Sequence, residues 1–306
     1  MPDPHPATYD AEERFPLDLP ASGAWMPGDP AGDRRFITVT DGRPFALEGG
    51  GRLDEVVLAY ESWGELAPDG SNAVLVCHAL TGASHAAGSS GPGHPAAGWW
   101  EDLIGPGRAI DTDRFFVVCS NVLGGCQGST GPASTDPATG RPYGSNFPQV
   151  TARDMVRAQA RLADRLGIDR WVAVIGGSMG GMQVLEWGAM FPRRVGSLIP
   201  LATVAAASAL QIGYSAVERL AIVTDPKFAG GHYYDAAPGD GPWHGLAVAR
   251  QIAQITYRTS ESFDGRFGRD LHDPLREFTR GAASRSSPTS TITGRSWCGG
   301  STPTRI

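Results

Sequence analysis

Ser178 is the residue with the clearest chemical potential, because it stands in the sequence Gly176-Gly177-Ser178-Met179-Gly180. An apolar run over 171–175 precedes it and a helical pattern over 182–190 follows, which predicts a sharp strand-to-helix turn at the serine. Such a turn strains the serine backbone, and side chains at 176 and 180 would collide with neighbouring elements. We therefore predict a covalent nucleophile for acyl transfer; the alternative is a structural turn whose serine caps a helix.

Acyl transfer also needs donors for the negative charge on the tetrahedral intermediate. The backbone N–H of Met179 lies at the start of the predicted helix and is a candidate donor. A second donor is expected from a loop that follows an earlier strand. The sequence His78-Ala79-Leu80-Thr81-Gly82 follows the apolar run 73–77, and we select the backbone N–H of Leu80. The alternative for this segment is an ordinary exit from a strand.

The elements that must position these residues alternate along the chain. Buried strands are predicted at 73–77, 115–119, 171–175 and 198–201, with a helix over 153–166 and hairpins over 36–60. This alternation predicts an α/β fold with a mainly parallel sheet and helices on both faces. Helical patterns at 207–224 and 246–257 predict an inserted cap. The expected division is a mobile leader at 1–33, a core at 34–204, a helical cap at 205–281 and a tail at 282–306.

Composition excludes several functional classes. The 306 residues carry a net charge of −6, whereas nucleic-acid binders normally present a basic face. No apolar run is long enough to span a bilayer, and the acidic, proline-rich start lacks the features of a signal peptide. The four cysteines have no framework spacing, which favours reduced thiols in the cytoplasm. No His, Cys or carboxylate cluster has the sequence spacing of metal ligands, so neither a metal nor a bound cofactor is predicted.

Five groups of motifs together resemble the homoserine O-acetyltransferase family, whose members have the α/β-hydrolase fold. The matching strings are HALTG at 78–82, GPGHP at 91–95 with Gly98-Trp99-Trp100, SNVLGGCQGSTGP at 120–132, GGSMGGMQVLEW at 176–187, and Ala249-Arg250 with Thr256-Tyr257-Arg258. The resemblance covers about residues 34–281. The long glycine-rich string at 120–132 favours this family over esterases of the same fold.

The resemblance implies a ping-pong reaction of methionine biosynthesis. Ser178 would take an acetyl group from acetyl-CoA, a co-substrate, and the hydroxyl of L-homoserine would then receive it. Arg250 matches the family arginine that holds the substrate carboxylate, and its alternative is an ion-paired helix arginine. A homodimer through the cap is also implied. Succinyl-CoA as donor, serine as acceptor, or ester hydrolysis are the competing activities.

The family's catalytic Asp and His lie in segments similar to GITSDRLYP and GHDGF, and neither string is present. His272-Asp273 resembles the second only superficially, and a surface role in the cap is the preferred interpretation. Residues 282–306 contain eleven Ser or Thr and no Asp, Glu, Lys or His. Their sequence matches a family continuation read one base out of frame. We therefore expect a truncated, frameshifted chain without its triad Asp and His, with negligible acetyl transfer, or a non-catalytic remnant that associates with intact subunits.

Overall fold

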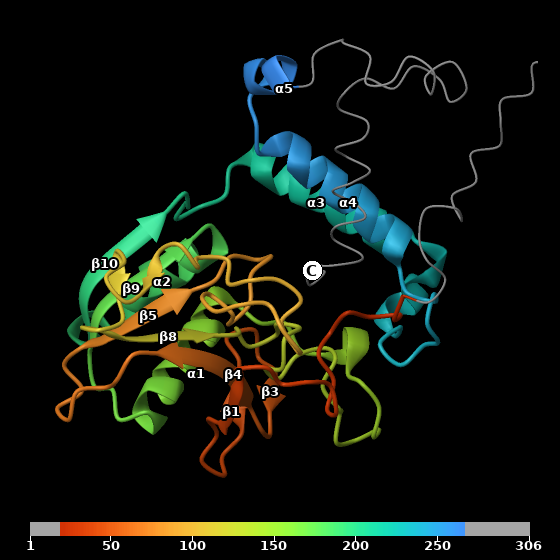
Figure 1. Cartoon of the computed structure of the whole chain (residues 1–306). Helices are drawn as coiled ribbons and strands as arrows, with labels where there is room; N and C mark the ends of the chain where they lie inside the picture. The colour runs from red at the N-terminus through yellow and green to blue at the C-terminus, as the bar shows by residue number, and fades with distance from the viewer. Residues whose placement is uncertain (1–18, 267–306) are drawn as a thin grey trace, which may run out of the picture. The chain divides into compact units, whose positions relative to one another are not determined.

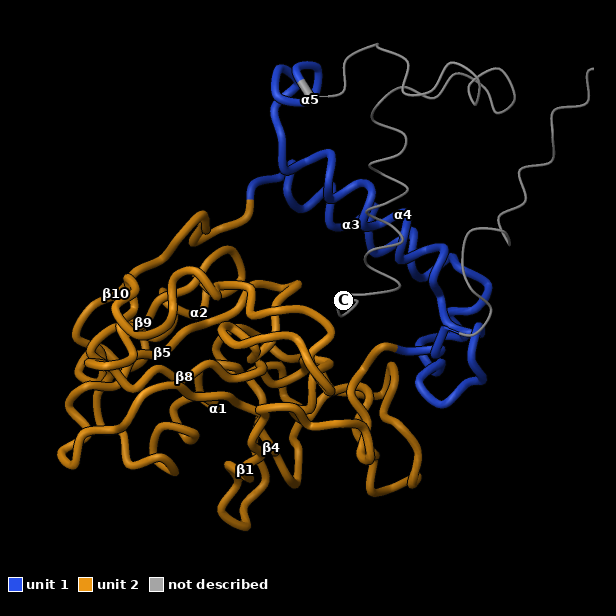
Figure 2. The backbone as a smooth tube through the Cα atoms, in the orientation of Figure 1, with its two compact units in different colours: residues 1–22, 208–303 blue, residues 23–207, 304–306 orange. Residues whose placement is uncertain are grey.

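The computed structural model describes residues 19–266. Within them the chain forms two compact units, coloured separately in Figure 2. The larger unit comprises residues 23–207, and the smaller comprises residues 19–22 and 208–266. The division between Ala207 and Ser208 lies close to the predicted boundary between core and cap. The predicted tail at 282–306 lies outside the described residues.

A six-stranded sheet forms the centre of the larger unit (Figure 1). Its order is β1 (Arg35–Thr38), β4 (Val57–Trp63), β8 (Phe116–Ser120), β5 (Ala73–Cys77), β9 (Trp171–Gly177) and β10 (Val195–Leu201). The strands from β8 to β10 are parallel to one another, and β4 is antiparallel to both of its neighbours. This arrangement confirms the predicted mainly parallel sheet. Two short pairs flank it: β2 (Phe45–Ala46) with β3 (Arg52–Leu53), and β6 (Ile104–Gly105) with β7 (Ile110–Asp111).

The two faces of the sheet are covered differently. Alternate strand residues such as Leu75 and Val174 share one core cluster with residues of α1 (Ala152–Arg165) and α2 (Met179–Met190). Their neighbours, such as Val76, share a second cluster with Ala86, Ala87 and Ile104. Helices on both faces were predicted, but in residues 23–207 the irregular segment around 83–111 covers the second face. A buried strand must be covered by apolar residues, and a loop rich in Ala and Trp supplies them here.

The start of α1 is fixed by a buried carboxylate. Thr151 and Asp154 form a capping box, in which the Thr151 hydroxyl accepts from the Asp154 N–H and the Asp154 carboxylate accepts from the Thr151 N–H. The same carboxylate accepts from the Glu48 N–H at 3.0 Å and pairs with Arg157. Burial opposes its ionisation, but these hydrogen bonds outweigh that effect and hold the pKa of Asp154 below its ordinary value. Asp154 therefore joins α1 to the 45–53 hairpin.

The smaller unit is built around two long helices, which lie where the sequence predicts helices over 207–224 and 246–257. It contains α3 (Ala209–Val223), the short helix η4 (Pro226–Gly231), α4 (Trp243–Thr256) and α5 (Ser260–Arg266). A Cβ on Gly245 would lie 2.3 Å from the Ala221 carbonyl oxygen, so α4 approaches α3 closely at this glycine. Asp225 accepts from the N–H groups of Lys227 and Gly245 and ties η4 to α4. No helix of the described segment has both the length and the apolar character required to cross a bilayer.

The segment before β1 is packed rather than extended. The Trp25 N–H donates to the Cys126 carbonyl at 2.9 Å, and the Trp25 ring lies 4.7 Å from that of Phe36. Buried Arg34 donates to the Gln127 side chain. A mobile leader at 1–33 was expected from the absence of a hydrophobic period, yet residues 23–33 contact the loop at 126–127. Tertiary contacts of single side chains leave no periodic signal in sequence. Residues 1–18 lie outside the described part of the chain.

We predict that Asp154→Asn lowers the free energy of unfolding by about 1–2 kcal/mol at pH 7, because it weakens the cap and the contact with Glu48. A lowered folded-state pKa means that the stabilisation is present above the ordinary carboxyl pKa and is lost as the pH falls through the folded value. The difference between variant and parent in urea unfolding should therefore shrink below about pH 4. Asp164→Asn is the control, since that carboxylate is 62% exposed and pairs with Arg194 at the surface. An equal loss in both variants would contradict the prediction.

Candidate active site

Ser178 lies at the turn between β9 and α2, with φ 54° and ψ −119°. A non-glycine residue with positive φ costs about 1–3 kcal/mol and needs surrounding structure to hold it. The Ser178 N–H donates to the Leu201 carbonyl on β10 at 3.0 Å, and its own carbonyl accepts from Thr203 and Met182. The strained serine predicted from the sequence is thus confirmed.

The glycines on either side of Ser178 are required by close contacts. A Cβ on Gly176 would lie 2.7 Å from the Cys77 carbonyl oxygen and from the Gly180 backbone. A Cβ on Gly180 would lie 2.1 Å from the same Cys77 oxygen and 3.0 Å from that of His78. All of these distances are shorter than an ordinary van der Waals contact. The first turn of α2 therefore rests against the end of β5, as the glycine spacing predicted.

This contact brings the two predicted oxyanion segments together. Met179 is the first residue of α2, so no residue within the helix accepts from its N–H. Buried Gln183 donates to the Met179 carbonyl at 3.2 Å and to the His78 carbonyl at 3.4 Å. Gln183 itself accepts from Gln159, which in turn accepts from the indole of Trp187. Sequence reasoning missed this buried chain because its members, at 159, 183 and 187, read as ordinary helix positions.

His78 begins the segment that contains Leu80, and its ring is buried. The ring Nε2 accepts from the Val122 N–H at 3.1 Å, so the proton lies on Nδ1, which donates to the Ala79 carbonyl at 2.7 Å. Burial lowers the pKa of His78 and keeps it neutral, although the hydrogen bond to Ala79 acts in the opposite direction. The Leu80 side chain is 42% exposed. His78 therefore joins the predicted oxyanion segment to the glycine-rich loop that starts after β8.

Arg250 lies on α4 in the smaller unit and is buried. Burial raises the pKa of Glu218 on α3 above its ordinary value, and the guanidinium of Arg250 partly offsets this rise. The surroundings of Arg250 thus include a carboxylate of its own unit. This agrees with the ion-paired alternative as well as with a binding role.

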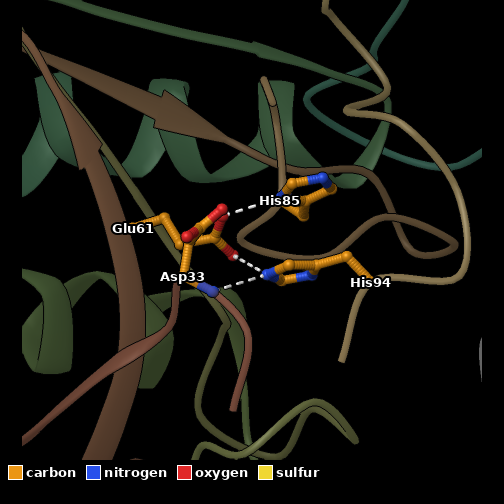
Figure 3. Close-up of side chains that lie close together, drawn as sticks. All are labelled: Asp33, Glu61, His85 and His94. Atoms are coloured by element: carbon orange, nitrogen blue, oxygen red, sulfur yellow. Dashed lines mark hydrogen bonds and ion pairs between the residues drawn. The ribbon is translucent and has the colours of Figure 1, made fainter. Parts of the chain in front are cut away.

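A buried cluster that the sequence did not reveal surrounds Glu61 on β4 (Figure 3). Its carboxylate accepts from the Ser84 hydroxyl at 2.7 Å and lies 2.8 Å from His85 Nδ1 and 3.7 Å from His94 Nε2. The two imidazole rings stack at 3.7 Å with an angle of 8°. Burial lowers the pKa of His94, with Arg34 and His85 acting in the same direction against Glu61 and Asp33. The cluster fastens the loop after β5 to β4.

Glu61, His85, His94 and Asp33 are also a group whose ligand atoms lie within 4.8 Å of one another. A metal would need nitrogen lone pairs that converge on one point at about 2.0–2.1 Å. The parallel rings do not converge in this way, and His94 Nε2 already accepts from the Asp33 N–H at 3.0 Å. The nearby Arg34 guanidinium also disfavours a cation. The four residues therefore form a hydrogen-bond network that holds loops in place. The sequence did not predict this network because its members are far apart along the chain.

A serine nucleophile needs a histidine base and a carboxylate to orient it. The larger unit holds three histidines, and their hydrogen bonds go to other partners: His78 to Ala79 and Val122, His85 to Glu61, and His94 to Asp33. None of these three contacts Ser178. Asp270, His272 and Asp273 lie outside the described residues.

Comparison with known proteins is consistent with this geometry. A sequence model of the alpha/beta hydrolase fold family matches residues 72–288, which is more than half of the chain. The chain belongs to the α/β-hydrolase fold family. The strained serine lies at a strand-to-helix turn between β9 and α2, within the sequence pattern Gly-x-Ser-x-Gly.

Several curated proteins similar to this chain are named as acyltransferases. A homoserine O-acetyltransferase of Thermobifida fusca is 59% identical over 255 residues, covering 83% of this chain and 66% of the relative. A homoserine O-succinyltransferase of Halorhodospira halophila is 53% identical over 232 residues, covering 76% and 60%. The chain thus spans less than two thirds of the length of these relatives.

Solved structures give the same fold. A homoserine O-acetyltransferase from Bacillus anthracis matches with a TM-score of 0.74 and 29% identity, covering 86% of this chain and 70% of that one. The esterase E22 matches with a TM-score of 0.75 and 29% identity, covering 89% and 74%. Structural similarity alone therefore does not separate transferases from esterases.

The close contacts at the elbow predict different effects for two neighbouring glycines. Gly180→Ala should destabilise the chain by about 1–3 kcal/mol, because its Cβ would meet the Cys77 carbonyl. Gly177→Ala should be tolerated, since its Cβ would meet only the Leu201 oxygen, at 3.9 Å. Thermal unfolding of both variants measures the difference. Equal melting temperatures would contradict the proposed close approach of α2 to β5.

Proposed function

We propose that Ser178 is acylated by acetyl-CoA and that the acetyl group passes to the hydroxyl of L-homoserine. The observation that carries this proposal is a strained serine close to two backbone N–H groups, those of Met179 and Leu80, which donate to no backbone carbonyl among the described residues. The similarity to homoserine O-acetyltransferases supports the choice of substrates. On this basis the chain is by descent an acyltransferase of methionine biosynthesis. We still expect its acetyl transfer to be negligible, because the hydrogen bonds of the three histidines in the larger unit go to residues other than Ser178.

The proposed chemistry has two symmetrical halves. The Ser178 hydroxyl would give its proton to a general base, a role that the hydrogen bonds of His78, His85 and His94 do not assign to any of them, and would attack the thioester carbonyl. The intermediate then breaks its carbon–sulfur bond, and the base returns the proton to CoA, which leaves as its thiol. The homoserine hydroxyl then attacks the acyl-serine, and Ser178 leaves with a proton. Each half places negative charge on the former carbonyl oxygen, where the N–H groups of Met179 and Leu80 would donate.

Arg250 is the proposed ligand of the homoserine carboxylate. Its planar guanidinium can donate two parallel hydrogen bonds to a carboxylate, and its burial would strengthen them. The motif Ala249-Arg250 supports this assignment through the family resemblance. Lysine could not supply the same paired geometry.

Two alternatives have specific support. The relative from Halorhodospira halophila is named a homoserine O-succinyltransferase, so succinyl-CoA is a candidate donor. The similarity to the esterase E22 makes ester hydrolysis a second candidate. An esterase would turn over p-nitrophenyl acetate without an acceptor, whereas the proposed transferase would need homoserine to release its acyl group.

Mass spectrometry after incubation with acetyl-CoA tests the proposal directly. We expect an acetyl adduct to form slowly on the peptide that contains Ser178, and to form faster with acetyl-CoA than with succinyl-CoA. Its transfer to added homoserine should be negligible. Ser178→Ala should show no adduct. If the unaltered chain shows no adduct with either donor, acylation of Ser178 by these donors is excluded and the non-catalytic alternative is favoured.

We also propose that the helical unit forms a homodimer in the cytoplasm. Several apolar residues of α3 and α4 are more than half exposed: Leu210, Ile212, Val217, Leu220 and Ile255. A second copy of this chain would cover them by a symmetric contact. Free thiols at Cys77, Cys119 and Cys126 support a reducing compartment.

Sedimentation velocity tests the dimer. Leu220→Asp should shift the chain to the monomer, because it places a charge in the centre of the proposed apolar contact. Leu103→Asp is the matched control, since Leu103 is exposed in the other unit. A dimer that survives Leu220→Asp, or a monomeric parent chain, would exclude this interface.

A further inference from the structure

The two peptide groups proposed as oxyanion donors share an unusual feature on their carbonyl side. The peptide that carries the Met179 N–H has the Ser178 carbonyl, and the peptide that carries the Leu80 N–H has the Ala79 carbonyl. Each of these oxygens accepts two hydrogen bonds, one from the backbone and one from a side chain. The backbone donors are Met182, at 3.1 Å, and Gly82, at 2.9 Å.

The side-chain donor to the Ser178 carbonyl is the Thr203 hydroxyl, at 2.7 Å. Thr203 lies two residues after the end of β10. Ala202, the residue between them, has φ 42° although it is not a glycine. It packs so tightly on α2 that a Cβ on Gly181 would lie 2.6 Å from the Thr203 Cβ and Cγ2 atoms. A strained residue and a required glycine thus hold this hydroxyl in place.

The side-chain donor to the Ala79 carbonyl is His78 Nδ1, also at 2.7 Å. The Val122 N–H occupies Nε2 and therefore fixes the proton on Nδ1. The imidazole is 3% exposed, so water competes little with this hydrogen bond. The tautomer and the ring orientation are both determined by the fold.

A hydrogen bond to a peptide oxygen draws electron density from the nitrogen, because the amide is conjugated. The N–H of the same peptide then becomes a stronger donor. The effect is strengthened by burial at His78, whereas the Thr203 hydrogen bond is exposed and acts mainly by fixing the direction of its peptide. The two side chains also fix the direction in which each N–H points.

We infer that Thr203 and His78 are positioning residues, each of which orients and polarises one of the two peptide N–H groups that would receive the oxyanion. The inference deepens the proposed function and rests on its assignment of Met179 and Leu80. Neither side chain needs to contact the substrate. Thr203 acts through the Ser178–Met179 peptide, and His78 acts through the Ala79–Leu80 peptide.

NMR of the full chain with ¹⁵N-labelled Met and Leu tests this without requiring turnover. Thr203→Val keeps the side-chain shape but loses the hydroxyl, so it should shift the Met179 amide resonance and leave that of Leu80 unchanged. Thr203→Ser should restore the Met179 resonance. His78→Leu should shift Leu80 and spare Met179, and His78→Asn, which can keep a donor near Nδ1, should largely restore it.

Thr224→Val is the matched control, because Thr224 donates a similar hydrogen bond to the Leu220 carbonyl in the other unit. It should shift neither resonance. If Met179 does not respond to Thr203→Val, or if Thr203→Ser fails to restore it, the role of Thr203 is overturned. Should the His78 variants not fold, the Thr203 series still decides the inference.

The rate of Ser178 acetylation provides the functional readout. Thr203→Val should slow adduct formation by about tenfold with unchanged acetyl-CoA binding, because a weakened donor costs less than a deleted one. Thr203→Ser should recover the rate. Absence of any adduct in the unaltered chain would refute the acyl-enzyme while leaving the NMR result intact. Equal rates in Thr203→Val and the parent would overturn the role of Thr203 in acylation.

Discussion

The first turn of α2 and the end of β5 approach so closely that their backbones are almost in contact at Gly180 and the Cys77 carbonyl. The other features of the site depend on this approach. It sets the direction of α2, it forces Ser178 into positive φ, and it brings the Met179 and His78 segments within reach of one glutamine side chain. The Ser178 N–H donates to the Leu201 carbonyl at the end of β10, and the Thr203 hydroxyl donates to the Ser178 carbonyl; these two hydrogen bonds hold the strained turn. Only glycine at 176 and 180 permits this arrangement.

Buried polar side chains hold the neighbouring loops and helices in place through hydrogen bonds. Gln183, Gln159, His78 and Glu61 all lie below 4% exposure, and each has hydrogen-bond partners in a neighbouring loop or helix. In a low-dielectric interior an unsatisfied polar group is costly, so such networks specify one loop conformation rather than several. No helix fixes the conformation of the loop after β5. The Glu61 carboxylate, together with the imidazoles of His85 and His94, fixes it instead. Loop and elbow are thereby held by separate networks on different strands.

Periodic apolar runs made most of the fold predictable. The strands at 73–77 and 171–175 and the helices α1 and α2 follow directly from them, and the glycine spacing around Ser178 predicted the elbow. The covering of the second sheet face was not predictable, because a loop that buries Ala and Trp has no period. Thr203 and Glu61 escaped notice for a related reason. Their importance comes from partners 23 to 25 residues away in sequence, which the sheet topology alone brings together. The environment of Arg250 likewise depends on how α3 packs against α4.

The fit between Gly181 and Thr203 has an evolutionary consequence. A methyl group at 181 would occupy the space of the Thr203 side chain. The effect of a substitution at either position on stability therefore depends on the residue at the other. Sequence libraries that vary 181 alone would recover glycine, and those that vary 203 alone would recover small hydroxyl side chains. Only simultaneous variation would reveal other combinations. A larger residue at 181 is therefore expected to require a smaller residue at 203 in the same chain.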